Sequence, residues 1–284
     1  MADTVQLGLI GDNIARSRAP LLHRLAGRLT GCEVRYDRLI PGDLGKDFDT
    51  VFDDCAQSGF RGINVTYPYK EKAAAKVVID DPLVRAIGAV NTVVFAPDGP
   101  KGYNTDYTGF QAAYRLVRGE EAPGTVCMIG AGGVGKAVAY GLVALRLKSL
   151  RVVERDLPKA AALAHALRAG HPGLDVTATA DTAEAAAGAD GLINCTPVGM
   201  VGYEGTPLER GLMRGARWAF DAVYTPVDTA FLTAAQAEGL AIVSGYELFF
   251  FQGVHAWDIF VGRPLDQDAL RAALLAASDE EAAA

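Results

Sequence analysis

A glycine-rich turn carries the clearest chemical signal in this sequence: Gly130-Ala131-Gly132-Gly133-Val134-Gly135. It follows an apolar run, 126–129, and precedes a stretch, 136–147, that has the composition of a helix. In a strand–turn–helix unit the first glycine permits a tight turn, the second lets a pyrophosphate approach the backbone, and the last lets the helix pack against the strand. The helix N-terminus adds free N–H groups and the positive end of a dipole. The pattern therefore predicts that residues 130–135 bind a dinucleotide, with an ordinary α/β turn as the alternative.

An acidic residue after the next apolar run supports the dinucleotide interpretation. Residues 150–153 form that run, and Glu154 follows it, 19 residues after Gly135. A carboxylate at this place accepts hydrogen bonds from the hydroxyls of an adenine ribose and repels the extra 2′-phosphate of NADP. The sequence therefore favours NAD as the cofactor. Arg155 could bind that phosphate, so NADP stays the alternative.

Polar residues interrupt the ends of several other apolar runs, where α/β proteins place their ligands. The segments are 64–70, 88–92, 102–106, 194–200, 221–226 and 245–252. Within the first of them, Lys70 falls in the first turn of an expected helix. Taken alone, Lys70 is typical of a solvated surface lysine, and Asp106 is typical of a helix N-cap or a turn.

Taken together, these segments resemble the shikimate dehydrogenase family, which includes the quinate/shikimate dehydrogenases, in the same order and spacing over nearly the whole chain. The resemblance implies a catalytic pair, Lys70 and Asp106. It implies reversible, NAD(P)-dependent oxidation of a ring hydroxyl of shikimate or quinate to the 3-dehydro ketone. The residues that it assigns to the substrate are Ser17, Thr66, Asn91, Tyr224 and Gln252, and those on the nicotinamide side are Thr196, Met200, Val223 and Gly245.

The chemistry of an alcohol dehydrogenase fits the implied pair. Oxidation needs a base for the hydroxyl proton while hydride leaves the same carbon. In the reverse direction a cation stabilises the developing alkoxide. A lysine beside an aspartate could do both, and the two groups would titrate as a unit.

The segment Ser17-Arg18-Ala19-Pro20 departs from the family pattern, which has two hydroxyl residues spaced by one before the proline. Ser17 is kept, but Ala19 replaces the second hydroxyl, so the grip on the substrate carboxylate is expected to be weaker or rearranged. Arg16 or Arg18 could supply charge instead, and a solvated arginine is the alternative for each. The departure motivates a second hypothesis, an aminoshikimate-type or other secondary-metabolism dehydrogenase. A non-catalytic dinucleotide sensor is a third, and the presence of both Lys70 and Asp106 argues against it.

Strand and helix patterns alternate along the whole chain, which predicts the α/β class with parallel strands covered by helices on both faces. Of the 284 residues, 50% are hydrophobic, enough for two packed cores. We expect two domains. Residues 1–107 plus 247–284 form an α/β substrate-binding and catalytic domain, and residues 108–246 form a Rossmann-type dinucleotide-binding domain with a parallel sheet.

The expected elements follow the apolar runs. Strands are predicted over 7–10, 34–40, 62–66 and 89–95 and near 126, 151, 175, 192, 219 and 242, and helices over 20–29, 48–57, 68–78, 108–117, 136–147, 159–169, 183–187, 246–260 and 266–277.

Composition also excludes several classes of partner. The net charge of −7 gives no reason to expect nucleic acid or an anionic membrane, and no apolar run reaches the ~18 residues of a membrane span. The four cysteines and four histidines show no ligand spacing, so no metal is expected. The N-terminus shows no secretory pattern, so the cytoplasm is expected. The expected partner is a small hydroxy-acid substrate, and the sequence leaves a homodimer open.

Overall fold

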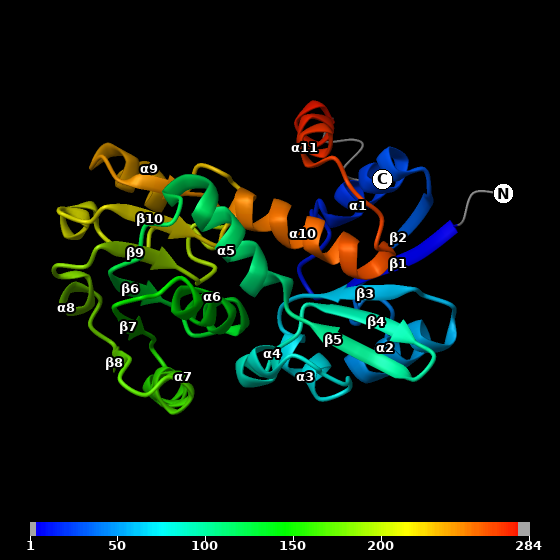
Figure 1. Cartoon of the computed structure of the whole chain (residues 1–284), viewed down its shortest axis with the longest axis horizontal. Coiled ribbons are helices and arrows are strands. Elements are labelled where there is room, and N and C mark those ends of the chain that lie inside the picture. Colours follow the sequence, from blue (N-terminus) through cyan, green and yellow to red (C-terminus); the bar gives the residue numbers. More distant parts are fainter. Residues whose placement is uncertain (1–3, 278–284) are drawn as a thin grey trace. The chain divides into compact units, whose positions relative to one another are not determined.

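The structure is a computed structural model that describes residues 4–277 (Figure 1). The chain divides into two compact units, Met1–Thr105 with Gln252–Ala284, and Asp106–Phe251. The structure divides after residues 105 and 251. The first predicted boundary, after residue 107, is two residues later, and the second, after residue 246, is five residues earlier. The second boundary falls inside one continuous helix, α10 (Gly245–Val261), so no linker composition marks it in the sequence.

The first unit contains a mixed five-stranded sheet in the order β2-β1-β3-β4-β5. Its strands are β1 (Thr4–Ile10), β2 (Glu33–Leu39), β3 (Gly62–Val65), β4 (Thr92–Ala96) and β5 (Gly99–Tyr103). β1 runs parallel to β2 and β3, whereas β3–β4 and β4–β5 are antiparallel. The chain moves from β1 to β2 and back past β1 to β3, so right-handed crossovers place α1 (Ala19–Thr30) and α2 (Phe48–Gln57) on opposite faces.

Two predictions for this unit are corrected. The strand expected over 89–95 starts only at Thr92, and a further strand, β5, forms a hairpin with it. The helix expected over 68–78 is only α3 (Lys70–Ala74). It ends early because Val78 pairs with the sheet: its N–H donates to Pro100 O at 2.9 Å, and its carbonyl accepts from Gly102 N at 2.8 Å. A tertiary contact here overrides the local helix pattern.

The remaining helices of the first unit are α4 (Pro82–Ile87), part of α10, and α11 (Gln267–Ala276). α4 was not predicted. One face of the sheet packs against α2 in a core that includes Phe48, Phe52, Ile63 and Val93. This core holds β3 and α3, and it thereby fixes the segment that carries Lys70.

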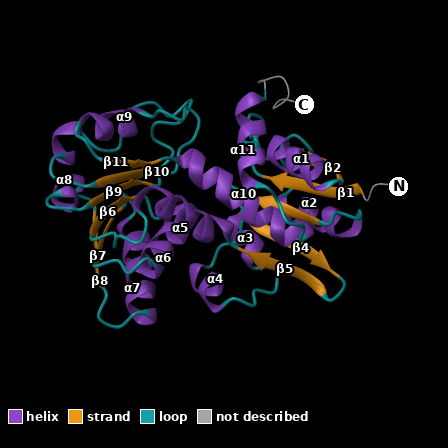
Figure 2. Ribbon diagram, turned by 45° about the horizontal axis from the view of Figure 1, so that its top comes forward, coloured by secondary structure: helices purple, strands orange, loops and turns teal. Residues whose placement is uncertain are grey.

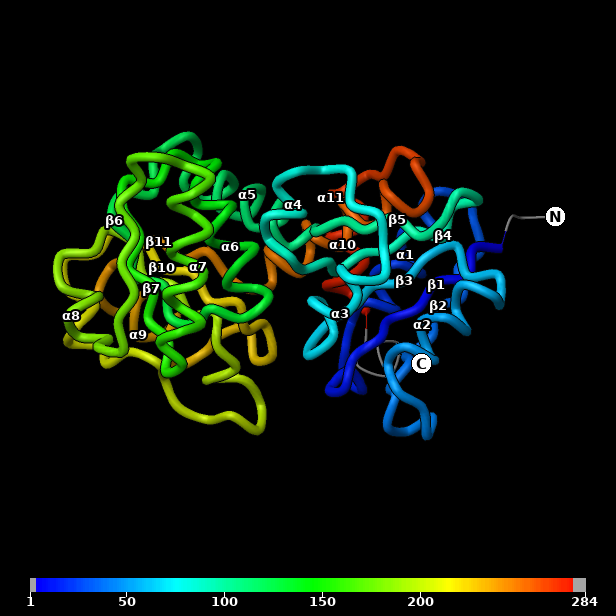
Figure 3. Tube along the Cα trace, turned by 90° about the horizontal axis from the view of Figure 1, so that it is seen from below, coloured from blue at the N-terminus to red at the C-terminus, as the bar shows by residue number. Residues whose placement is uncertain are grey.

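The second unit contains a parallel six-stranded sheet in the order β11-β10-β9-β6-β7-β8, which is the order of a dinucleotide-binding fold. The strands are β6 (Thr125–Ile129), β7 (Ser149–Val153), β8 (Asp175–Thr179), β9 (Gly191–Asn194), β10 (Trp218–Asp221) and β11 (Ala241–Val243). All six predicted strands are confirmed. An α-helix lies between consecutive strands except between β9 and β10, which a long loop with a short 3₁₀ helix joins. Figure 3 shows the path of the chain through this unit.

Helices cover both faces of this sheet, as predicted. α6 (Gly133–Ala144) and α7 (Leu157–Gly170) lie on one face, and α8 (Thr182–Ala186) and α9 (Ala230–Ala237) lie on the other (Figure 2). α5 (Thr105–Arg118) begins at the boundary between the units, and a short 3₁₀ helix, η1 (Arg210–Met213), precedes β10. α9 and η1 were not predicted.

Within residues 4–277, no helix is both long and apolar enough to cross a membrane.

Candidate cofactor and substrate sites

The glycine turn has the backbone geometry that the sequence predicted. Gly130 has φ +103°, a conformation that favours glycine, and it directly follows β6. A Cβ atom on Gly135 would lie 2.2 Å from Gly130 O, so only glycine lets α6 pack this closely on the turn. α6 begins at Gly133, three residues earlier than the predicted 136, because the turn itself passes directly into the helix.

The middle of the turn, in contrast, faces open space. A Cβ on Gly132 would meet nothing closer than Lys159 Nζ, at 4.0 Å. Gly132 is the N-cap of the 12-residue helix α6, and no side chain caps this helix end. An open backbone, an uncapped helix N-terminus and a nearby ammonium group are features that suit a pyrophosphate. The residues therefore fit a dinucleotide.

Glu154 follows β7 and folds back against the same turn. Its Oε2 accepts a hydrogen bond from Ala131 N at 3.0 Å, and its Oε1 accepts from Arg155 N at 2.9 Å. Partial burial opposes ionisation, but these backbone hydrogen bonds, with one from Asp156 N, hold the pKa of Glu154 below its ordinary value. The carboxylate is therefore ionised at neutral pH and places a negative charge beside the glycine turn.

The carboxyl ends of β9 and β10 carry three of the residues predicted for the nicotinamide side. Thr196 Oγ1 donates to Asn194 Oδ1 at 2.7 Å, and Val223 N donates to Asp221 Oδ1 at 2.9 Å. Met200 lies in the loop after Thr196, where its N–H donates to Pro197 O at 3.0 Å. The fourth, Gly245, starts α10, and a Cβ on it would lie 2.3 Å from Val223 O.

Tyr224 follows this turn, and its ring stacks on Phe249 with the ring centroids 5.0 Å apart. Gln252, also predicted to bind the substrate, is half-buried in α10. The part of α10 that belongs to the first unit begins at this residue.

The predicted catalytic residues are both buried at helix starts. Lys70 is the first residue of α3 and is 9% exposed, and Asp106 lies in the first turn of α5 and is 6% exposed. The backbone holds Lys70 through its carbonyl, which accepts from Val90 N at 3.0 Å. Lys70 is therefore not the solvated surface lysine that it would be on its own, since an ionisable side chain is rarely buried without a structural or functional reason. Asp106 lies at a helix start, where its own alternative also places it.

Asn91, predicted to contact a ring hydroxyl, holds the start of α5. Its Oδ1 accepts from Thr105 N at 2.7 Å, and its Nδ2 donates to Thr105 Oγ1 at 2.9 Å. Its Oδ1 also accepts from Thr92 Oγ1 at 3.1 Å. The amide oxygen is therefore saturated, and the second N–H of Nδ2 is the group that could meet a ligand.

Behind Asn91 lies a neutral polar network that the sequence did not reveal. Asn64 Nδ2 donates to Asn91 O at 3.2 Å and to Thr92 Oγ1 at 3.1 Å, and Tyr36 OH donates to Asn64 Oδ1 at 2.8 Å. His23 stacks on Tyr36 with the ring centroids 5.1 Å apart. Burial lowers the pKa of His23 to about 3, against a raising effect of Asn64. In the sequence, only the presence of Asn64 within the apolar run 62–65 hinted at this network.

The Ser17 segment leads directly into α1. Ser17 Oγ accepts from Ala19 N at 3.3 Å, and Ser17 O accepts from Arg38 Nη2 at 3.0 Å. Arg18 is half-buried, and its Nη2 donates to Leu274 O in α11 at 2.9 Å. Arg18 is therefore not a fully solvated arginine, because its guanidinium binds the end of α11. Arg16 is exposed. Thr66, half-buried, follows β3, and its N–H donates to Ile10 O at 2.9 Å.

Two segments of the sequence match known family patterns. Residues 9–93 match the shikimate dehydrogenase substrate-binding domain. Residues 125–202 match the coenzyme F420-dependent NADP oxidoreductases.

Two curated relatives cover almost all of the chain. The quinate/shikimate dehydrogenase (NAD(+)) of Corynebacterium efficiens is 36% identical over 96% of this chain and 98% of its own. The shikimate dehydrogenase (NADP(+)) of Pseudarthrobacter chlorophenolicus is 37% identical over 98% of this chain and 97% of its own. The chain belongs to the shikimate/quinate dehydrogenase family.

Solved structures of this family share the fold. The quinate dehydrogenase from Corynebacterium glutamicum in complex with NAD superimposes with a TM-score of 0.88, at 32% identity, over 97% of this chain and 100% of its own. The shikimate 5-dehydrogenase from Thermus thermophilus in complex with NADP(H) and shikimate gives a TM-score of 0.82 at 30% identity, over 98% of this chain and 99% of its own. The predicted family, its class of NAD(P)-dependent oxidoreductases and the two-domain α/β fold are thereby confirmed.

Members of the shikimate/quinate dehydrogenase family thus differ in cofactor, and the residues of this chain have to indicate which cofactor it uses.

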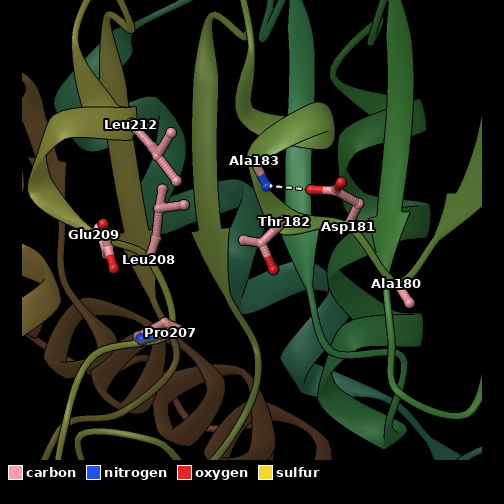
Figure 4. A pocket seen from close by; sticks show the side chains of 8 residues that line it. All are labelled: Ala180, Asp181, Thr182, Ala183, Pro207, Leu208, Glu209 and Leu212. Carbon is pink, nitrogen blue, oxygen red and sulfur yellow. Dashed lines mark hydrogen bonds between the residues drawn. The ribbon is translucent and has the colours of Figure 1, made fainter.

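An open surface depression of about 600 Å³ lies away from the predicted site residues. It lies between the turn after β8 and the segment 207–212, and two of its lining residues are joined by a hydrogen bond from Ala183 N to Asp181 Oδ1, 2.9 Å long (Figure 4). The residues that line it, all in the described part of the chain, include none of the predicted site residues.

Proposed function

We propose that this chain catalyses the reversible, NAD-dependent oxidation of a ring hydroxyl of shikimate or quinate to the 3-dehydro ketone, with Lys70 and Asp106 as the acid–base pair. The observation that carries the proposal is the burial of both ionisable groups at helix starts, at 9% and 6% exposure, in a member of this family. The curated relatives named above act on shikimate or quinate.

Lys70 and Asp106 have different roles in the proposed reaction. Lys70 takes the hydroxyl proton as the alcohol becomes a ketone and returns it in the reverse reaction. Bound NAD would supply the acceptor for the hydride that leaves the same carbon. Asp106 positions the amine. In reduction, the protonated amine stabilises the alkoxide that develops on the ketone oxygen.

The substrate is proposed to lie against Ser17, Thr66, Asn91, Tyr224 and Gln252. Asn91 can offer one N–H to a ring hydroxyl while its oxygen holds Thr105. Ala19 N already donates to Ser17 Oγ, so the serine hydroxyl keeps its own proton to donate to a carboxylate.

NAD is favoured over NADP because Glu154 is ionised and faces the turn. The turn 130–135 would bind the pyrophosphate, Glu154 and Arg155 the adenosine half, and Thr196, Met200, Val223 and Gly245 the nicotinamide half. In this proposal, residues 108–246 form the dinucleotide domain, and residues 1–107 plus 247–284 form the substrate domain.

Initial rates of the wild type with shikimate, quinate and an amino analogue, each with NAD and with NADP, test the function. We expect turnover of shikimate or quinate that is faster with NAD. Selective turnover of the amino analogue would instead support the alternative that Ala19 motivates. Binding of NAD without turnover of any of the three would support a sensor.

A further inference from the structure

The adjacent strands β9 and β10 both end in a buried polar residue. Asn194 and Asp221 are register partners across this strand pair, and both are 0% exposed. Asn194 Nδ2 donates to Asp221 Oδ1 at 2.9 Å. The pair therefore joins the carboxyl ends of two neighbouring strands.

The Asp221 carboxylate accepts three hydrogen bonds. Besides Asn194, it accepts from Val223 N at 2.9 Å on Oδ1 and from Thr229 Oγ1 at 2.7 Å on Oδ2. Burial raises the pKa of Asp221 to about 6, while the hydrogen bonds from Thr229, Val223 and Asn194 lower it. An environment made only of donors suits the ionised form, so at neutral pH the carboxylate fixes the turn that begins with Val223.

Asn194 fixes the other turn with the rest of its amide. Its Oδ1 accepts from Thr196 N at 2.9 Å and from Thr196 Oγ1 at 2.7 Å. Its Nδ2 also donates to Val198 O at 2.9 Å. All polar positions of this side chain are engaged, so the two turns cannot shift independently without leaving a buried group unpaired.

Close packing transmits this restraint to the ligand-facing backbone. A Cβ on Gly130 would lie 3.0 Å from Thr196 Cγ2, and a Cβ on Gly245 would lie 2.7 Å from Asp221 O. The neighbouring turns therefore pack so closely on these two glycines that no side chain fits between them. The positions of Thr196 and Val223 relative to the glycine turn are therefore set by the buried pair.

The strand order indicates which half of a dinucleotide meets these turns. A dinucleotide spans the switch point of such a sheet, here between β6 and β9. Glu154 at the end of β7 lies on the adenosine side. The ends of β9 and β10 lie on the opposite side, which leaves them to the nicotinamide half.

We propose that Asn194 and Asp221 are positioning residues for the nicotinamide half of the cofactor, acting through the turns of Thr196 and Val223. The inference rests on the proposed function and extends it. The adenosine half is held by features that the pair does not touch: the backbone of residues 131–133 and the Glu154 carboxylate. Substitution of either residue should therefore weaken the binding of NADH more than the binding of ADP-ribose, which lacks the nicotinamide.

The test is the affinity of the full-length Asp221→Ala variant for NADH and for ADP-ribose, measured by calorimetry. Loss of the acceptor leaves the Val223 N–H and the Asn194 amide unpaired, so we expect NADH to bind about 10-fold more weakly, with ADP-ribose within about 2-fold of the wild type. A role in folding alone would change both affinities together or change only the melting temperature.

Asp190→Ala is the matched control. Asp190 also accepts from a backbone N–H, Thr125 N at 2.7 Å, and pairs with Arg217 at 3.1 Å, but it lies at the amino ends of the strands. It should lower the melting temperature and leave the ratio of the two affinities unchanged. If Asp221→Ala does not fold, Asp221→Asn keeps one oxygen acceptor and should show a smaller loss of the same selectivity.

Equal losses for both ligands, or no loss for either in a folded Asp221 variant, would overturn the inference. A wild-type chain that binds ADP-ribose but turns over no substrate would contradict the proposed function while leaving the ratio test in force. A wild type that binds neither ligand would overturn both.

Discussion

Two buried polar networks, one in each unit, hold strand ends in opposite electrostatic ways. In the second unit, Asn194 leads to the carboxylate of Asp221, which accepts three hydrogen bonds. In the first unit, Asn64 leads to neutral partners, Tyr36 and Thr92, and the stacked His23 is held uncharged by burial. The second-unit network contains a buried carboxylate, whereas the side chains of Asn64, Tyr36 and Thr92 in the first-unit network are neutral.

The difference matches what each strand end has to present. The first network ends at Asn91, whose amide clasps Thr105 directly before Asp106. A second charge there would act on the proposed acid–base pair. The second network anchors the turns proposed for the nicotinamide half through its buried carboxylate. Burial raises the pKa of the Cys195 thiol in one of these turns, and the charges of Asp221 and Asp106 both add to this effect.

The largest expected effect comes from the charged residues beside the neutral network. Lys70→Ala should reduce kcat by at least ~100-fold, as for loss of a general acid–base group, with a smaller change in KM. Lys72→Ala is the matched control, because Lys72 lies on the same helix but is exposed. Asp106→Asn should also reduce kcat, and the double variant should fall well short of additivity. Unchanged kcat in Lys70→Ala would remove this lysine from the mechanism.

The neutral network should lose stability in acid. His23 has a folded-state pKa of about 3, below the 6.5 of the unfolded chain. The contribution of neutral His23 to the free energy of unfolding is therefore complete above pH 6.5 and is lost as the pH falls toward 3. At pH 5 this loss amounts to about 2 kcal/mol. Urea unfolding of the wild type and His23→Phe at pH 8 and pH 5 isolates it as a double difference, and equal pH dependence of the two proteins would show that the pKa of His23 is the same in the folded and the unfolded chain.

The charge beside the glycine turn should set the cofactor. Replacing Glu154 with serine removes the ionised carboxylate that accepts from Ala131 N, so the preference for NAD over NADP, measured as the ratio of kcat/KM, should fall by about 10-fold. Asp156→Ser, which removes a carboxylate two residues away that caps α7, is the control and should change the ratio less. A wild type that is faster with NADP would contradict the interpretation of Glu154.

The strands of the second unit could be predicted from the sequence more completely than those of the first, for a physical reason. The strands of the second sheet are buried on both faces, so each is a short apolar run between turns, as in Val126–Ile129. β5 contains Gly99, Pro100 and Gly102 and has almost no strand propensity, so only its pairing with β4 makes it a strand.

The same limit applies to the sites. The glycine turn lies directly between β6 and α6, so its conformation could be predicted from local spacing. The hydrogen bond from Ala131 N to Glu154, 23 residues apart in sequence, could not. The bond between Asn194 and Asp221 depends on β9 lying next to β10. The bonds between Asn91 and Thr105 join the segment before β4 to the start of α5. Neither pairing follows from local spacing.

The smallest expected effect lies at the cap of α1. Ala19→Ser adds a hydroxyl two residues from Ser17 and should lower the KM for shikimate by a few-fold, up to ~10-fold if a full hydrogen bond to the carboxylate forms. The KM for quinate, which carries a hydroxyl on the same carbon as its carboxylate, should change less. An unchanged or raised KM for shikimate would show that position 19 does not limit carboxylate binding.

The most direct test of the proposed reaction is the fate of the hydrogen on the carbinol carbon. Shikimate or quinate deuterated at the carbon that becomes the ketone should transfer its label to NAD, so mass spectrometry should find singly deuterated NADH in step with the dehydro product. Lys70→Ala should form both products much more slowly at the same ratio. Formation of the ketone without label in the cofactor, or no labelled NADH from either acid, would contradict the account.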